Sequence, residues 1–582
     1  MKFLRRIFSY KDFWPIVIVL TFGILAGRSL LTSGYFIMHD DLQMMRQFEM
    51  EKCFLDGQIP CRWVPDLGFG YGFPLFNFYP PLPYLIGQGI RLFGFAFTDT
   101  VKLTFSLSLL VSGIGMYFLA KEFFGRFGGI VSSVFYIWAP YHAVDIYVRG
   151  AMNEAWALAL FPLILWTSYR LINEKKNITK WVIGLALSWF GLLTSHNLMV
   201  LIFAPVFLLW LLLHLVRKKA YAKIPHLAVS GILALGLASF FTLPALVENG
   251  LTHLSSAFEG YFDFAGHFVT VNQLLFSRFW GYGGSAWEIS NDGMSFQIGK
   301  IHWILSLVIF VLLIYRYIKT KKVDNLLLVS VFFFLIGWFS AFMAHSRSTP
   351  IWLLFAPLKY VQFPWRFLTI VILAFSFLMG ALPGLILKGK KKIVLGSVMV
   401  IVLVFLNWSY FLPKGGKMGP LTDEEKFTGV AWELQQNGGI NDYLPINAKI
   451  APDSPRKILA EILKGKGEIK NMELGTNWAS FDAAVESEKA QVRIGIFHFP
   501  NWRVFVDGAE VGIFIPEEES WGRMYIELSK GSHEVYLKIY NTTARTASNV
   551  ISLITWTGLL TFPFWKRKLG VLKSRHGDWR AS

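Results

Sequence analysis

Residues 39–82 read HDDLQMMRQFEMEKCFLDGQIPCRWVPDLGFGYGFPLFNFYPPL and begin shortly after an apolar run at residues 13–31. The stretch opens with a histidine and two adjacent carboxylates, His39, Asp40 and Asp41, and its second half is rich in aromatic residues, glycine and proline. Ionisable side chains are costly at the end of a membrane helix unless they face water or have a function. The apolar run and the acidic loop together predict a membrane helix that leads into a polar site.

The composition is that of an integral membrane protein. Of its 582 residues, 54% are hydrophobic and 17% are aromatic, which is too apolar for a soluble protein of this length. Apolar runs of roughly 17 to 25 residues, long enough to span a bilayer as helices, recur along most of the chain. The first run follows a basic start but has no small-residue cleavage site, so it is interpreted as a retained anchor.

The net charge of +18 is concentrated in short connections that alternate along the chain. The positive-inside rule assigns these connections to the cytoplasm, and we therefore interpret them as topology signals and expect no nucleic-acid partner. The basic connections are residues 175–180, 217–223, 316–322, 388–392 and 566–568.

These signals predict an α-helical polytopic membrane protein with about twelve spans, both termini in the cytoplasm and two large outer loops, 33–100 and 247–300. Within the first loop, the short apolar piece 80–93 follows a proline cluster and is predicted to be an interfacial helix. The predicted spans are 13–31, 101–120, 129–139, 155–172, 181–195, 198–216, 227–246, 301–318, 326–343, 367–385, 393–411 and 551–565.

The composition changes at residue 413 to that of a soluble domain, which the parity of the spans places outside the membrane. We therefore divide the chain into a transmembrane domain (1–412), an outer β-rich domain (413–548) and a final span with a basic tail (549–582). Alternating apolar and polar residues, with turns at Asp507-Gly508 and Lys530-Gly531, predict an antiparallel β-sandwich approached by a helical segment at 424–436. The predicted strands are 493–497, 503–506, 523–528 and 534–540.

The two cysteines of the chain, Cys53 and Cys61, both lie in the first outer loop. An oxidising outer compartment would allow a local disulfide between them, while two isolated buried thiols are the alternative.

Ionisable residues from separate loops share the depth of the outer membrane face. A carboxylate there can act as a general base, and arginine binds phosphate through its bidentate guanidinium. No cofactor is certain, but a divalent cation, Mg or Mn, held by Asp40 and Asp41 is possible. Taken singly, each residue could also be an ordinary solvated or helix-capping group. The set comprises His39, Asp40, Asp41, His142, Asp145, Arg149, Glu154, His196, Glu248 and Arg366.

Adjacent residues of an extended segment point in opposite directions, so Asp40 and Asp41 cannot both face one site. One of them would be catalytic while the other binds a partner or caps the next helix, and the sequence does not say which.

Several stretches together resemble a known family. They are HDDLQ, GQIPCRWVPDLGFGYGFPLFNFYPPLPYL, YVRGAMNEAWALALFPL, TSHNLM, VQFPWRFL and NWRVFVDGAEV. They resemble the bacterial membrane proteins called "6-pyruvoyl-tetrahydropterin synthase related" and their YfhO-like relatives, and more broadly the GT-C membrane glycosyltransferases. The pterin name does not predict an activity, because the sequence contains no soluble pterin synthase domain or its zinc-binding histidines.

The resemblance implies a GT-C-like fold whose active site includes the acidic motif Asp40-Asp41, with Arg149 and Glu154 in a second outer-loop motif. It implies a glycosyltransferase of the bacterial cytoplasmic membrane that moves a sugar from a polyprenyl-phosphate-linked donor to an outer glycan, lipid or protein acceptor. We predict Asp40 and Asp41 to be catalytic, and the substrate-binding residues to be His39, Asp145, Arg149, Glu154, His196, Glu248 and Arg366.

The aromatic half of the first loop, with Trp63, Tyr71 and Phe78, could stack on sugar faces or anchor the loop at the headgroup level. Two other functions are kept open for the protein as a whole. One is a transporter or flippase for a lipid-linked intermediate, and the other is a non-catalytic scaffold for envelope assembly.

Overall fold

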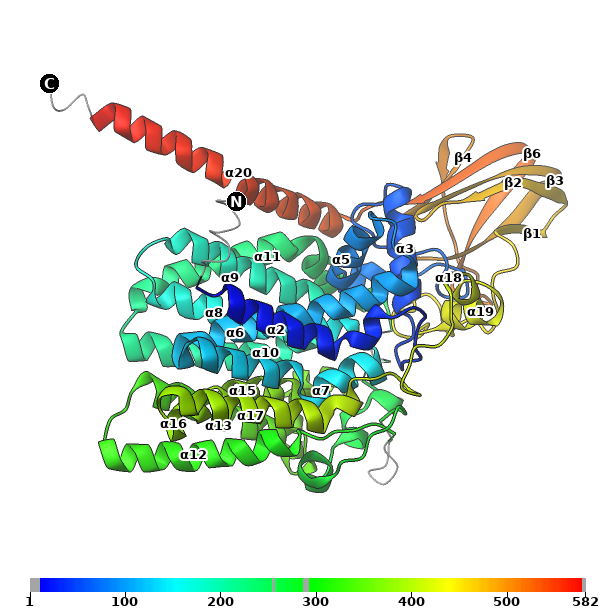
Figure 1. Ribbon diagram of the computed structural model, residues 1–582. Helices are drawn as coiled ribbons and strands as arrows, with labels where there is room; N and C mark the ends of the chain where they lie inside the picture. The colour runs from blue at the N-terminus through cyan, green and yellow to red at the C-terminus, as the bar shows by residue number, and fades with distance from the viewer. Residues whose placement is uncertain (1–10, 254–255, 257, 286–292, 578–582) are drawn as a thin grey trace.

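The computed structural model describes residues 11–253, 256, 258–285 and 293–577, and the side chains up to residue 562. Parts of the predicted outer loop 247–300, the basic N-terminal start and the end of the basic tail lie outside these residues. A bundle of long helices fills one half of the molecule, and the outer loops and a β-sheet gather at one end of it (Figure 1). The protein is a multi-pass membrane protein.

The helices of the bundle reproduce the predicted spans. Nine helices of the described part are long and apolar enough to cross a membrane. α6 turns non-helical at Gly125, with φ 73°, and so contains two predicted spans, while α2 and α20 contain the first and the last. The helices are α2 (Phe13–Ala26), α6 (Phe97–Ile137), α8 (Met152–Asn173), α9 (Ile178–Ser195), α10 (Asn197–Lys218), α11 (Ile224–Val247), α12 (Lys300–Thr320), α13 (Asn325–Met343), α15 (Leu368–Met379), α16 (Leu382–Ile386), α17 (Gly389–Asn407) and α20 (Thr543–Gly577).

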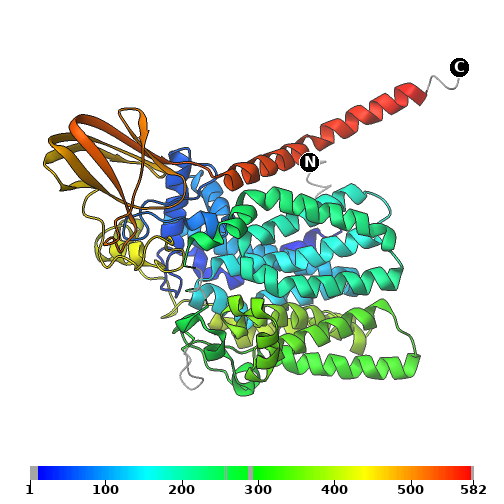
Figure 2. The ribbon, with the colours of Figure 1, turned by 180° about the vertical axis from the view of Figure 1, so that it is seen from behind.

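The final helix α20 packs its first turns on α11 through small side chains. The Ser239 hydroxyl donates to the Ser548 carbonyl at 2.7 Å, and the Ser552 hydroxyl donates to the Leu237 carbonyl at 2.7 Å. Small residues let two helix backbones approach closely in a membrane. Toward its C-terminal end, α20 leans away from the other helices in both views (Figure 2).

Most of the short helices lie at the end of the bundle next to the β-sheet (Figure 1). The predicted interfacial piece is the helix α5, which buries Tyr84 and leaves Phe93, just after the helix, 83% exposed. The predicted helical approach to the β-rich domain is formed by α18 and α19. The short helices are α3 (Gln43–Leu55), α4 (Leu75–Phe78), α5 (Leu82–Arg91), α7 (Pro140–Ala143), α14 (Thr349–Leu354), α18 (Asp423–Lys426) and α19 (Gly429–Asn437).

The β-rich domain is one antiparallel sheet, whereas the sequence predicted a sandwich of two. Its strand order is β1-β3-β6-β4-β5, and β2 also pairs with β3. The predicted turn at Lys530-Gly531 is wrong, because β6 continues through it opposite a bulge in β3, while the turn at Asp507-Gly508 is confirmed. The strands are β1 (Ala460–Lys464), β2 (Gly467–Leu474), β3 (Trp478–Phe497), β4 (Trp502–Val506), β5 (Ala509–Val511) and β6 (Arg523–Ile539).

The predicted first outer loop packs against the sheet and buries its apolar side chains, as the second sheet of a sandwich would do. Trp63, Tyr71 and Phe78 share a buried apolar cluster with residues of the sheet. The Trp63 ring lies 5.6 Å from that of Trp502, centroid to centroid, in an edge-on arrangement. Gly72 permits this packing, since it has φ +84° and a Cβ there would lie 2.5 Å from the Trp63 ring nitrogen. The loop therefore joins the helical bundle to the sheet.

Two contacts fix this loop and the α18 segment. Cys53 and Cys61 form a disulfide, with their Cα atoms 5.5 Å apart, which settles the alternative left open above. The Asp423 carboxylate accepts hydrogen bonds from the backbone N–H groups of Phe97 and Thr98 at 2.7 and 2.9 Å. It thereby satisfies orphan N–H groups at the start of α6.

Trp63→Ala should loosen the sheet from the bundle. Trp63 is 2% exposed, and truncating a buried tryptophan costs about 3–5 kcal/mol of folding free energy. We expect faster proteolysis between residues 440 and 540 in detergent and a lower melting temperature. Phe93→Ala is the matched control, since Phe93 is 83% exposed. Equal proteolysis of both variants would contradict this role for Trp63.

Candidate functional site

A cavity of about 560 Å³ is lined by segments at the ends of several helices of the bundle. Its wall is built from the first outer loop, the starts of α8 and α10, the end of α11, the segment before α15 and residues beside α19. Six of the predicted site residues line it, namely His39, Asp40, Arg149, Glu154, His196 and Arg366.

The acidic motif is held against the second outer loop by its backbone. The N–H of His39 donates to the Val148 carbonyl at 3.1 Å, and that of Asp40 donates to the Arg149 carbonyl at 2.9 Å. The Gln43 amide adds a 2.8 Å bond to the Gly150 carbonyl. The two motifs that the sequence singled out separately therefore form one wall.

Asp40 and Asp41 have different surroundings. Asp40 lines the cavity, and its Oδ2 accepts from Arg46 at 2.8 Å and from Gln43 at 3.0 Å. The Asp41 carboxylate instead forms a 2.5 Å ion pair with Lys426 of α18. Burial raises the pKa of Asp41, and the Lys426 charge opposes that rise. The geometry thus separates the pair, although residues 39–42 form a turn and not the extended segment that the sequence suggested.

Two arginines face the cavity around one buried carboxylate. Glu154, in the first turn of α8, is 0% exposed and lies 2.9 Å from the Arg149 guanidinium and 3.5 Å from that of Arg366. The Tyr141 hydroxyl donates to the second Glu154 oxygen at 2.6 Å. Arg149 also contacts Asp145 at 2.5 Å, although Asp145 lies behind the cavity wall.

The two arginines share two buried carboxylates, of which Glu154 lines the cavity and Asp145 lies behind its wall. Burial, and next the charge of Glu154, raise the pKa of Asp145 well above its usual range, while the charges of Arg149 and Arg366 oppose that rise. Two guanidinium groups are thereby held at the cavity wall. The rings of Trp365 and Phe363 lie 4.7 and 5.0 Å from the Arg149 and Arg366 guanidinium carbons and hold them in place without neutralising them.

The three histidines of the predicted set occupy different places. His39 and His196 line the cavity, and burial, followed by the Arg366 charge, lowers the pKa of His196 to about 3. His142 packs edge-on against Tyr136 outside the lining, where burial lowers its pKa to about 3. His142 and His196 are thus neutral at physiological pH and available only as hydrogen-bonding groups.

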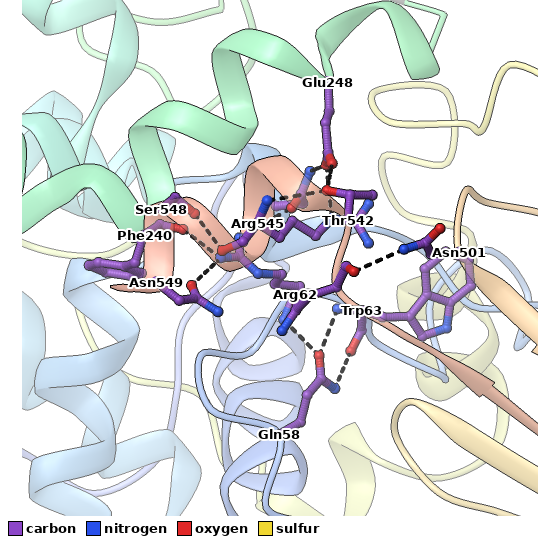
Figure 3. Close-up of polar contacts among 12 residues, drawn as sticks. Gln58, Arg62, Trp63, Phe240, Glu248, Asn501, Thr542, Arg545, Ser548 and Asn549 are labelled. Atoms are coloured by element: carbon purple, nitrogen blue, oxygen red, sulfur yellow. Dashed lines mark hydrogen bonds and ion pairs between the residues drawn. The ribbon is translucent and has the colours of Figure 1, made fainter. Parts of the chain in front are cut away.

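Glu248 lies outside the cavity lining. Its carboxylate accepts from Arg545 at 2.9 Å, from Asn77 at 2.8 Å and from the Thr542 hydroxyl at 2.6 Å (Figure 3). It fastens the start of α20 to the end of α11.

Sequence reasoning missed several residues of the cavity. Arg46 pairs with Asp40 and lies over the Tyr79 ring at 4.3 Å, and its place on the helix that follows the acidic motif was an available signal. Asp442 and Tyr443 come from the segment after α19, and no local pattern could place them beside Asp40. Burial raises the pKa of Asp442 to about 6.

The carboxylates do not fit the divalent cation that the sequence allowed. Asp40 and Asp41 each bind a basic side chain and point to different surroundings. Within the part of the chain that the structure describes, no group of three or more His, Cys, Asp or Glu side chains could hold a metal ion. The two aspartates are therefore described by their contacts with side chains of the protein.

Glu154→Gln should destabilise the protein strongly. Both arginines would stay buried without their shared carboxylate, and breaking a buried ion pair costs about 3–5 kcal/mol. We expect a marked fall in melting temperature in detergent. Glu174→Gln, at the other end of α8 where its side chain is 29% exposed, is the control and should change little. Equal melting temperatures for both variants would contradict a structural role for Glu154.

Stability should also depend on pH through Asp442. With a folded-state pKa near 6, against an ordinary value of 3.8, the folded protein holds this proton more tightly than the unfolded chain. This contribution is complete below about pH 4 and is lost as pH rises to about 6, amounting to about 2–3 kcal/mol. Asp442→Asn should flatten the dependence of melting temperature on pH in that window. The exposed Asp453→Asn should not, and an unchanged slope in the Asp442 variant would refute this assignment.

Comparisons with known proteins give the family. The model of the 6-pyruvoyl-tetrahydropterin synthase related domain, a membrane protein family, matches residues 76–413. An uncharacterized protein of Lactococcus lactis subsp. cremoris is 24% identical over 285 residues, which are 47% of this chain and 45% of that protein's length.

The fold is also similar to solved membrane glycosyltransferases. Arabinofuranosyltransferase AftD from mycobacteria is 14% identical with a TM-score of 0.43, over 70% of this chain and 27% of that one. ArnT from Cupriavidus metallidurans, bound to undecaprenyl phosphate, is 15% identical with a TM-score of 0.39, over 68% and 65%. The oligosaccharyltransferase AglB from Archaeoglobus fulgidus, in complex with an inhibitory peptide and a dolichol-phosphate, is 10% identical with a TM-score of 0.40, over 77% and 61%.

At these scores the function of the site rests on its own geometry. The resemblance to the pterin-related membrane family is confirmed. Because the family model matches more than half of the chain, the protein belongs to the 6-pyruvoyl-tetrahydropterin synthase related family of membrane proteins.

Proposed function

We propose that the protein is a membrane glycosyltransferase that moves a sugar from a polyprenyl-phosphate-linked donor to an acceptor outside the membrane. The observation that carries the proposal is that one cavity has the carboxylate of Asp40 and the cationic pair Arg149 and Arg366 on its wall. A transfer from a phosphate-linked sugar requires both a base for the acceptor and cations for the leaving phosphate.

The arginine side of the cavity suits the donor phosphate. Arg149 and Arg366 are each 8% exposed, so little solvent screens their charges. A guanidinium offers two parallel N–H groups to a phosphate, and its charge attracts the anionic donor. The same groups would stabilise the negative charge that grows on the phosphate as it leaves.

Asp40 suits the role of general base. Its hydrogen-bond donors Arg46 and Gln43 both bind Oδ2, and the side chain is 34% exposed, which leaves Oδ1 for an incoming hydroxyl. In the proposed step the acceptor oxygen bonds to the anomeric carbon, and its proton passes to Oδ1. The bond from the anomeric carbon to the phosphate oxygen breaks, and both of its electrons leave with the phosphate. Attack from the opposite face inverts the anomeric centre.

Aromatic side chains line the space between these two functions. Phe78, Tyr79 and Tyr443 belong to the cavity wall, and the rings of Phe78 and Tyr443 stack at a centroid distance of 5.8 Å. Such faces can pack on a sugar ring. Trp63 and Tyr71 were also candidates for this role, but their side chains pack against the sheet.

The proposal includes a place in the cell. The basic connections 175–180, 217–223 and 316–322 join helix ends remote from the β-sheet (Figure 1), so the positive-inside rule puts the cavity and the sheet outside the membrane. We therefore propose the bacterial cytoplasmic membrane, with both termini inside and the cavity open to the outer side.

Asp40→Asn should abolish transfer. Loss of a general base lowers turnover by about 10²- to 10⁴-fold. The double variant Asp41→Asn with Lys426→Gln removes the neighbouring ion pair without leaving a buried charge, and it should keep most of its turnover. The assay is release of polyprenyl phosphate from lipid-linked sugars extracted from the source membranes, with the protein in nanodiscs and the lipid products followed by mass spectrometry.

Equal turnover in Asp40→Asn and the native protein would overturn the assignment of the base. Movement of the lipid-linked sugar across the bilayer of proteoliposomes with no covalent product would replace the transferase with a flippase. A protein with neither activity would favour the scaffold.

A further inference from the structure

A second cavity, of about 220 Å³, lies apart from the first and shares no lining residue with it. It is enclosed by the loop 57–63, the end of β6 and the start of α20 (Figure 3). Three basic side chains line it, Arg62, Lys538 and Arg545. Among the described residues, no aspartate or glutamate lines it.

Two of these basic side chains are deeply buried and only partly satisfied. Arg62 is 7% exposed and donates to the Phe240 carbonyl and to Asn549, both at 2.7 Å. Arg545 is 2% exposed and donates through Nε to Glu248. Within the described part of the chain, Nε of Arg62 and Nη2 of Arg545 have no hydrogen-bond partner. Both arginines also contribute to the lining of the cavity.

One carboxylate serves this pair of arginines. Glu248 binds Arg545 directly, and its other partners are the neutral groups of Asn77 and Thr542. Burial, followed by the charge of Arg545, lowers the pKa of Arg62 to about 10, at which Arg62 is still cationic near neutral pH. The cluster thus carries a net positive charge next to an open space, and a buried cation without a counter-charge is costly.

The cavity lies where lipid headgroups are expected. Arg545 is six residues before the predicted start of the last span at Ile551, about 9 Å along a helix that rises 1.5 Å per residue. Arg62 reaches the Phe240 carbonyl in the last turns of α11, near the outer end of another span. A lipid phosphate at this depth could therefore reach the guanidinium groups that line the cavity.

We propose that this cavity is a binding site for a phosphate group, held by Arg62 and Arg545 with Lys538 at its rim. A volume of 220 Å³ corresponds to about seven water molecules at about 30 Å³ each, enough for a phosphate with part of the group that carries it. Phosphate oxygens can accept hydrogen bonds from the guanidinium and ammonium groups that line the cavity. The site does not depend on the proposed transferase activity.

The test measures phosphate binding by the full-length protein. Inorganic phosphate is titrated onto protein in a neutral detergent, with the melting temperature as readout, and sulfate-free chloride of equal ionic strength is the reference. In parallel, native mass spectrometry counts phosphatidylglycerol molecules retained from nanodiscs of phosphatidylglycerol and phosphatidylcholine. Stabilisation by inorganic phosphate identifies a soluble phosphate ligand, whereas retention of phosphatidylglycerol alone identifies a lipid head group.

Lys538→Glu should weaken binding of the active probe at least tenfold, because it places a carboxylate at the rim of the cavity. Lys530→Glu makes the same change on the same strand, at an exposed position outside the cavity, and should bind like the native protein. The double variant Arg545→Gln with Glu248→Gln removes both charges of the buried pair. It should lose binding while unfolding near the native temperature.

The proposal is overturned if neither probe binds saturably or if Lys538→Glu binds as well as Lys530→Glu. Should the double variant fail to fold, the comparison of the two lysine variants still decides.

Discussion

A carboxylate buried between two arginines organises the end of the helical bundle next to the β-sheet. Glu154 is inaccessible to solvent, and it holds Arg149 and Arg366, which come from the segments before α8 and α15, at one cavity wall. Because a lone buried charge would cost several kcal/mol, the three groups have to stay together, and with them the start of α8 and the segment before α15. The same arrangement presents two guanidinium groups where the proposed donor phosphate would bind.

The first outer loop depends on this arrangement and extends it. Its beginning hydrogen-bonds to the backbone around Arg149, so Asp40 reaches the cavity that the arginines define. Its second half packs Trp63 under the sheet, and between these two parts the loop places Arg62 beside α20. A single segment thus sets the positions of the acid, the sheet and the second basic cavity. Changes in this loop would disturb all three, which is why its aromatic half is long and closely packed.

The sequence predicted those features that depend on local patterns. Apolar runs and basic connections predicted the spans, and six residues of the predicted site, among them Asp40, Arg149 and Arg366, lie together in the lining of one cavity. The sequence could not distinguish the roles of Asp40 and Asp41, because the difference depends on Lys426, which lies 385 positions after Asp41 in the chain. It also split β6 at Gly531, because the continuity of this strand through a glycine depends on its pairing with the long strand β3. Glu248 shared the predicted depth but serves Arg545, an interaction that no local pattern encodes.

Both basic cavities run against the usual distribution of charge in membrane proteins. Lysine and arginine gather on the cytoplasmic side, yet Arg62, Arg149, Arg366 and Arg545 are buried at the end proposed to lie outside. Arginines with a purely structural role would be matched by carboxylates, because only pairing offsets the cost of burying them. At the first cavity Glu154 and Asp145 pair with the arginines, whereas at the second Glu248 contacts Arg545 and, among the described residues, no carboxylate lines the cavity. The second cavity therefore lacks the negative charge that would offset its arginines, and this is the strongest reason to expect that an anion completes it.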